Sequence, residues 1–202
     1  MKKLILSILL LSLEINAQNK FQSETDGASE LRGLINTSDA YFLSVDYSSV
    51  AEFKSGIGEY VDFYPSEFKN LNTNSVTKGL KILMKVLVPS IGLDGKITNT
   101  ALFRSIMLDD SEVKLFISFL EKHVGPKVGK ADKKDLKMYE TTIKFKEMIF
   151  TYASEGKSER ITMYARNYGV TGREKGETFI EFWTESQVEK VADLILVLKK
   201  II

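Results

Sequence analysis

The sequence predicts an α+β protein in which an antiparallel β-meander of about three to five strands packs against amphipathic helices and a C-terminal helix covers the sheet. Apolar and polar side chains alternate in several short segments, as in strands with one buried face. Apolar residues at helical spacing follow two potential N-caps, Asp109 and Thr184. Short turns between the strands favour antiparallel hairpins.

The N-terminal segment predicts export. Met1-Lys2-Lys3 precedes the apolar run 4–13, which is shorter than the about 20 residues of a membrane-spanning helix and typical of a signal peptide. We expect residues 1–17 to be removed near Ala17, which leaves a periplasmic or secreted protein without stable membrane insertion.

The remaining chain is expected to form one structured unit after a short leader. Residues 18–30 are mostly polar and predict a flexible leader. Residues 31–202 are interpreted as a single α+β domain, with a potential sub-boundary in the loop 124–136.

Residues 41–46 alternate in polarity and predict a short strand. The role of residues 47–70 stays open, although residues 60–64 could form a strand that Pro65 ends.

A helix is expected over residues 75–88, because its apolar residues fall on one helical stripe and Pro89 follows. The stripe consists of Val76, Leu80, Leu83, Met84 and Leu87. Residues 98–108 then predict a strand.

Asp109 and Glu112 have the spacing of a capping box and predict the start of the next helix. Gly125-Pro126 is expected to end this helix. Its buried stripe would consist of Val113, Phe116, Ile117 and Leu120.

The C-terminal third predicts strands. Residues 138–153 alternate with one change of parity, which we interpret as a long strand with a bulge near Glu147. A tight turn at 155–157 leads into a strand over 160–167, and another strand is expected over 177–183.

Thr184 and Gln187 have the spacing of a second capping box, which predicts a final helix through Leu198. Trp183 shares strand parity with Phe179, and we expect it to be buried where the last strand meets this helix.

Charge and cysteine content exclude several classes. Loss of residues 1–17 removes Lys2, Lys3 and Glu14, so that 28 basic and 27 acidic residues become 26 and 26. A neutral protein is a poor match for nucleic acid, which requires a basic excess. The absence of cysteine excludes disulfides and thiol chemistry.

The sequence favours a protein that is not an enzyme, although it does not decide the question. His123 is the single histidine, and its position near a helix C-terminus favours a structural role over general base catalysis. No calcium-loop pattern is present, and we expect neither a metal nor a cofactor.

The strand over 160–167 supplies the candidate binding residues. Ile161, Met163 and Ala165 would face the core, which leaves tyrosines and arginines facing outward. Tyrosine and arginine are common in binding hot spots. The predicted binding surface consists of Tyr164, Arg166, Tyr168 and, in the following loop, Arg173.

Eight aromatic residues between Tyr41 and Phe68 favour core packing over an apolar ligand groove. The functional hypothesis is a non-catalytic extracytoplasmic protein that binds a protein or a small apolar ligand. Two alternatives stay open: a small envelope hydrolase that uses carboxylate catalysis, and a structural accessory subunit.

Overall fold

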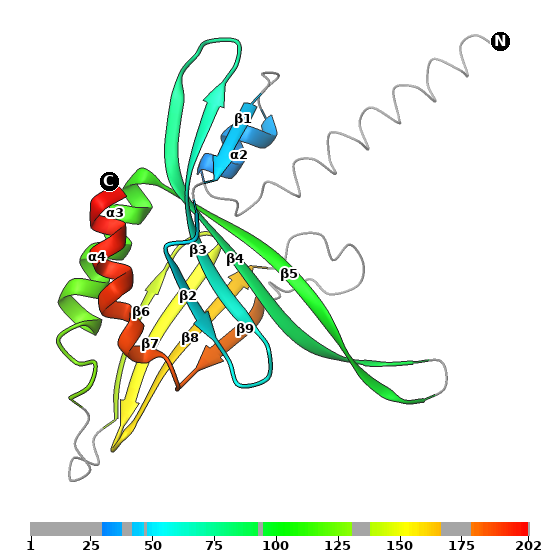
Figure 1. The fold of residues 1–202 in the computed structure, drawn as a ribbon, viewed down its shortest axis with the longest axis vertical. Coiled ribbons are helices and arrows are strands. Elements are labelled where there is room, and N and C mark those ends of the chain that lie inside the picture. Colours follow the sequence, from blue (N-terminus) through cyan, green and yellow to red (C-terminus); the bar gives the residue numbers. More distant parts are fainter. Residues whose placement is uncertain are drawn as a thin grey trace, which may run out of the picture.

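Two antiparallel sheets make up most of the structure, together with a few helices that include a C-terminal one (Figure 1). The computed structural model describes residues 30–37, 42–46, 48–92, 95–130, 138–166 and 179–201. The first sheet has the order β1-β3-β4-β5 with β2 also paired to β3, and consists of β1 (Phe42–Asp46), β2 (Ala51–Lys54), β3 (Tyr60–Asn70), β4 (Val76–Ile91) and β5 (Ile97–Asp109). The second has the order β6-β7-β8-β9 and consists of β6 (Tyr139–Lys144), β7 (Met148–Glu155), β8 (Ser158–Arg166) and β9 (Phe179–Thr184).

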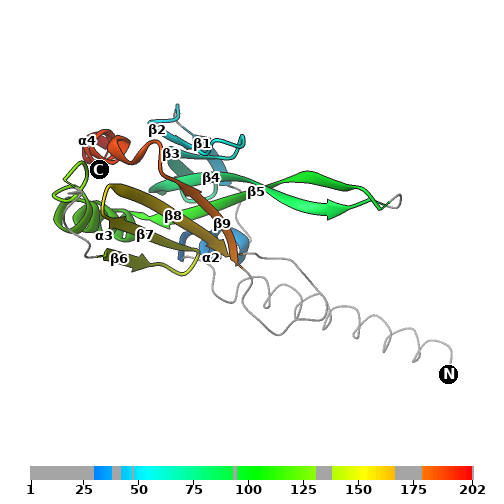
Figure 2. The same cartoon turned by 90° about the horizontal axis from the view of Figure 1, so that it is seen from below.

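The two sheets face each other, and α3 and α4 lie together at one end of the molecule (Figure 2). Buried residues from both sheets and from these helices form one hydrophobic cluster. The helical segments among the described residues are α2 (Glu30–Thr37), α3 (Asp110–Phe119), the π-helical turn η1 (Leu120–Val124), the 3-10 turn η2 (Val188–Lys190) and α4 (Val191–Ile201). The signal peptide and nearly all of the predicted leader lie outside the described residues.

β3 continues through Pro65 instead of ending there. β1 pairs with Ser66 to Asn70 of β3, whereas β2 pairs with Tyr60 to Phe63. Pro65 therefore lies between the two partners on this edge, where a residue without an N–H group interrupts neither ladder.

The helix expected over residues 75–88 is wrong, because this segment is the long strand β4. Leu80, Ile82, Met84 and Val86 alternate as buried residues and enter the core. Leu83 and Leu87 on the opposite face are half-buried. Because β4 contacts protein on both faces, residues on both of its faces are apolar, and polar and apolar residues do not alternate regularly along it. Its apolar residues therefore also fit the stripe of a helix.

The single bulged strand expected over residues 138–153 is also wrong. β6 and β7 are two strands of a hairpin, in which Lys144 is in register with Ile149. The backbone N–H of Phe145 donates to the carbonyl of Met148 at 2.7 Å and closes the turn. The change of parity near Glu147 therefore marks a reversal of chain direction.

The capping box at α3 is confirmed. The N–H of Glu112 donates to Asp109 Oδ1 at 2.8 Å, and the N–H of Asp109 donates to Glu112 Oε2 at 3.1 Å. The helical conformation continues through η1 to Val124 and ends before Gly125-Pro126, as predicted. All four residues of the predicted stripe are buried: Val113, Phe116, Ile117 and Leu120.

The second capping box is not formed, although the predicted helix exists. Thr184 Oγ1 donates to the carbonyl of Lys54 at 2.8 Å, and Gln187 Oε1 accepts from the N–H of Lys54 at 2.6 Å. These two side chains connect the end of β9 to the end of β2, and therefore join the two sheets.

Candidate functional site

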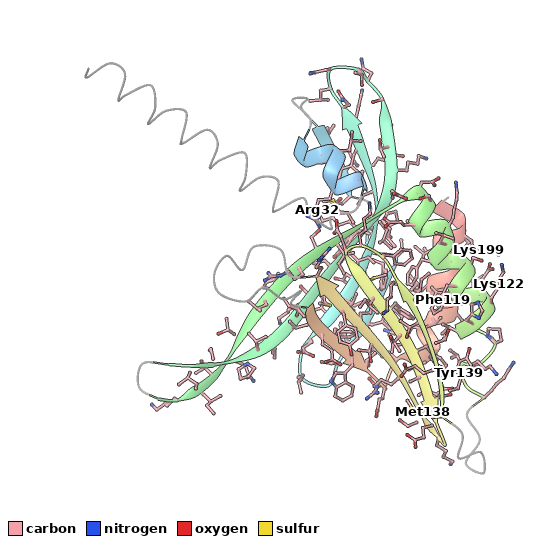
Figure 3. All side chains as sticks on the ribbon, turned by 180° about the vertical axis from the view of Figure 1, so that it is seen from behind. Arg32, Phe119, Lys122, Met138, Tyr139 and Lys199 are labelled. Carbon is pink, nitrogen blue, oxygen red and sulfur yellow. The ribbon has the colours of Figure 1, made fainter. Side chains whose placement is uncertain are left out.

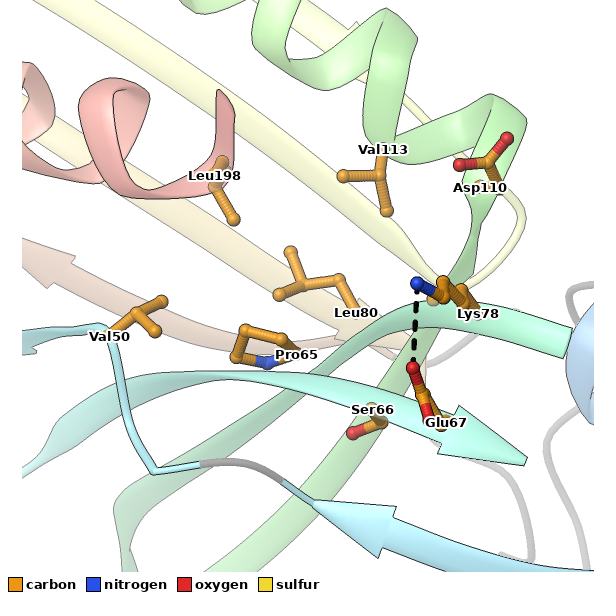
Figure 4. Close-up of a pocket in the computed structure, with 10 residues that line it drawn as sticks. Val50, Pro65, Ser66, Glu67, Lys78, Leu80, Asp110, Val113 and Leu198 are labelled. Carbon is orange, nitrogen blue, oxygen red and sulfur yellow. Dashed lines mark ion pairs between the residues drawn. The ribbon is translucent and has the colours of Figure 1, made fainter. Parts of the chain in front are cut away.

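A pocket with a volume of about 340 Å³ lies between the first sheet and helices α3 and α4 (Figure 4). Aliphatic side chains from five separate segments line most of it: Val50, Pro65, Leu80, Val113 and Leu198. The remaining lining residues are Ser66, Glu67, Lys78, Gly79 and Asp110.

The apolar walls are held by the core of the protein. Leu80, Val113 and Leu198 are each no more than 3% exposed. They come from β4, α3 and α4, and all three belong to the main hydrophobic cluster. Close packing on their far sides fixes their positions, so the pocket exists without a bound molecule.

Charged side chains lie together on one side of the pocket, away from Val50 and Leu198 (Figure 4). Glu67 and Lys78 are in register on β3 and β4 and form an ion pair at 3.5 Å. Asp110 pairs with Lys114 one turn later in α3. Each of the two carboxylates at the pocket therefore has a lysine partner.

Two strongly buried carboxylates elsewhere bind strand backbone. Glu59 Oε1 accepts from the N–H of Leu87 at 2.8 Å, and Glu147 Oε2 accepts from the N–H of Met107 at 3.0 Å. Leu87 lies beyond the end of the β3 register, and Met107 lies on β5, at the end of the strand order. The two glutamates therefore satisfy strand amides, which is a structural role.

Two of the four predicted binding residues lie in the described part of the chain. Tyr164 and Arg166 lie on β8, opposite in parity to the fully buried Ile161, Met163 and Ala165. The expected faces of this strand are confirmed, although Tyr164 and Arg166 are half-buried. Tyr168 and Arg173 lie outside the described residues.

Tyr164 has a polar partner on the neighbouring strand. Its hydroxyl donates to Glu181 Oε1 at 3.3 Å. Burial, followed by the charge and the hydrogen bond of Glu181, raises the pKa of Tyr164 above its ordinary value of 10.0. The phenol therefore stays protonated at neutral pH and can donate a hydrogen bond.

The expected burial of Trp183 is wrong, because its side chain is 50% exposed. Trp183 is in register with Thr162 on β8, whereas its neighbours Phe182 and Thr184 are buried. The inward face of β9 is therefore that of Ile180 and Phe182. Thr184 also lies on this buried face, but it is polar because its hydroxyl bonds to the end of β2. The sequence therefore does not mark Thr184 as a buried position, and the faces of β9 were predicted the wrong way round.

The phenylalanines of the aromatic cluster pack in the interior where the structure describes their side chains, whereas Tyr60 and Tyr64 are half-buried. Phe53, Phe63 and Phe68 are buried, and the rings of Phe53 and Phe63 meet edge to face at 5.8 Å between centroids. None of the described aromatic residues lines the pocket. Sequence reasoning missed the pocket because its residues are ordinary aliphatic side chains from distant segments.

Among the described residues, no group of three or more histidine, aspartate or glutamate side chains could hold a metal ion. No described helix is both long and apolar enough to cross a membrane.

No protein family, curated protein or solved structure matches the chain.

Proposed function

We propose that this chain is an extracytoplasmic, non-catalytic binding protein and that its ligand is a small apolar molecule held in the pocket between β3, β4, α3 and α4. The observation that carries the proposal is an aliphatic pocket of about 340 Å³ with its charged groups on one side. Binding sites for small molecules are typically apolar cavities of about 300–1,000 Å³ with a few polar groups that fix orientation.

The lining indicates the chemistry of the ligand. Val50, Leu80 and Leu198 offer only apolar surface, so the bound part of the ligand is aliphatic or aromatic. The Glu67–Lys78 pair can bind one polar group at the other end. Paired carboxylates are poorly suited to acid–base catalysis, which favours binding over the hydrolase alternative. The alternative of a structural accessory subunit does not account for the pocket.

Export and the position of the last helix belong to the same proposal. Residues 1–17 serve as a signal peptide, and α4 covers the sheet and supplies Leu198 as a wall of the pocket. Intact-mass measurement of the protein recovered from its native host should show Gln18 at the N-terminus. Recovery of the full-length chain in the membrane fraction would contradict export.

The binding test uses the neutral apolar fluorophore N-phenyl-1-naphthylamine. Val50 is half-buried at the pocket, so Val50→Phe adds a ring there, whereas Val45 is exposed on β1 and does not line the pocket. We expect the wild type and Val45→Phe to increase the fluorescence of the probe, and Val50→Phe to weaken binding about tenfold or more. Equal binding by both variants, or no binding by the wild type, would contradict the proposal.

A further inference from the structure

The outer face of the second sheet presents an ordered row of side chains. Thr142, Thr151, Thr162 and Trp183 are in register across β6, β7, β8 and β9. Thr142 Oγ1 and Thr151 Oγ1 lie 3.0 Å apart and share a hydrogen bond. The face therefore combines a line of hydroxyl groups with the single tryptophan of the chain.

The residues of this row differ in exposure. Thr162 is only 6% exposed although its strand parity places it on the outer face. Three large side chains lie next to Thr162 on this face: Trp183 in register on β9, and Arg160 and Tyr164 two residues to either side on β8. Trp183 nevertheless remains 50% exposed. The indole is therefore open to contact from outside the sheet, directly beside the row of threonines.

Charged residues lie at register positions next to this row, and none occupies a position within it. Glu140, Lys144, Arg160 and Glu181 are exposed on the same face of the sheet, and they carry both signs. The centre of the face is uncharged and rich in hydroxyl groups. Its electrostatic complement is therefore a neutral ligand with many hydroxyl groups of its own.

We propose that the outer face of β6 to β9 binds a neutral polysaccharide built from pyranose rings with equatorial substituents. In such a ring the axial C–H groups form an apolar face that stacks on an aromatic ring, while the hydroxyls around the edge form hydrogen bonds. Trp183 supplies the stacking surface, and Thr142, Thr151 and Arg160 supply hydrogen-bonding groups. A protein partner is a poorer match, because the centre of a protein interface is usually rich in large apolar side chains.

The experiment is electrophoresis of the mature protein through native gels that contain hydroxyethyl cellulose or glycol chitin, followed by calorimetric titration with cellohexaose and chitohexaose. The wild type should be retarded by at least one of the two polymers. Trp183→Ala should bind about five- to tenfold more weakly. Trp183→Phe keeps an aromatic face and should retain most of the affinity.

Two variants serve as controls. Phe103→Ala removes an aromatic residue that is similarly exposed, at 52%, but lies on the first sheet, and it should bind polysaccharide as the wild type does. Val50→Phe should also leave polysaccharide binding unchanged, which separates this site from the pocket. The inference is overturned if neither polymer retards the wild type, if Trp183→Ala binds as well as the wild type, or if light scattering shows that Trp183 instead mediates self-association.

Discussion

Arg32 of α2 donates hydrogen bonds from Nε and Nη2 to the two carboxylate oxygens of Glu147, each at 2.8 Å. Glu147 is 1% exposed and also accepts from the N–H of Met107 on β5. Nη2 of Arg32 donates in addition to the carbonyl of Ser105. Arg32 lies where α2 meets the strands (Figure 3). The pair therefore joins the first described helix, the edge of one sheet and the turn between two strands of the other.

Arg32→Ala should destabilise the protein strongly, because the charge of Glu147 stays buried when its bidentate partner is removed. Loss of one partner from a buried ion pair typically costs about 3–5 kcal/mol. Urea denaturation at neutral pH, with the loss measured as the difference in free energy of unfolding, provides the test.

An exposed ion pair supplies the control for that measurement. Lys199 and Glu121 pair at 2.7 Å, with side chains that are 53% and 40% exposed. Lys199→Ala should therefore change stability by no more than about 1 kcal/mol. Similar losses from Arg32→Ala and Lys199→Ala would show that burial of the Glu147 pair has little effect on stability.

Elements that are fixed by hydrogen bonds between residues close together in the chain could be predicted from the sequence. Asp109 and Glu112 start α3 through hydrogen bonds to each other's backbone, and both residues are visible in the sequence as a capping box. The similar pair Thr184 and Gln187 was misread, because its hydrogen bonds go to Lys54, 130 or more residues away. The sequence alone does not show that competing partner.

The errors in the strands have a similar cause. The turn between β6 and β7 contains Lys146 and Glu147, which are not typical turn residues. Glu147 is held there by Arg32, 115 residues earlier in the chain. The pocket was missed for the same reason, since Val50, Val113 and Leu198 come together only in the folded protein.

Gly79→Ala should destabilise the protein by about 1–3 kcal/mol through overpacking. A Cβ at Gly79 would lie 2.5 Å from the carbonyl oxygen of Leu108 and 2.8 Å from Leu31 Cδ2, so strand backbone as well as α2 would have to shift. Gly33 in α2 provides a matched control, because a Cβ there would meet nothing within 4 Å. Gly33→Ala should leave the melting temperature unchanged or raise it, and an equal loss from both variants would exclude the steric explanation.

The two faces of β8 should respond differently to truncation. Ile161 is fully buried, and Ile161→Ala should cost about 2–5 kcal/mol of stability. Tyr164 and Arg166 are half-buried on the outer face, so replacement of both by alanine should cost less, about 1–2 kcal/mol. Chemical denaturation of the two variants gives the comparison, and a greater loss from the double variant would show that the outer face contributes more to stability than the core side.

The last prediction concerns the dependence of stability on pH at Glu112. Burial is the main cause that raises the pKa of this carboxyl above its ordinary value of 4.5, and the neighbouring charges of Asp109 and Glu147 act in the same direction. The hydrogen bond from the Asp109 backbone opposes them only in part. The folded state therefore binds this proton more tightly than the unfolded state does. The resulting stabilisation is complete below the unfolded pKa, near 4.5, and is lost as the pH rises through the folded pKa.

Glu112→Gln tests this assignment with little change in shape, because glutamine also serves at this position of a capping box. The variant keeps an acceptor for the N–H of Asp109 but carries no titrating group. Relative to the wild type it should gain up to about 1 kcal/mol as the pH rises from 4 to 7, a modest figure because Glu112 is only partly buried and water screens its charge. Urea denaturation of both proteins at several pH values measures this difference directly. A variant that instead loses stability relative to the wild type as the pH rises would show that the helix dipole, which favours a carboxylate in the first turn of α3, outweighs the burial of Glu112.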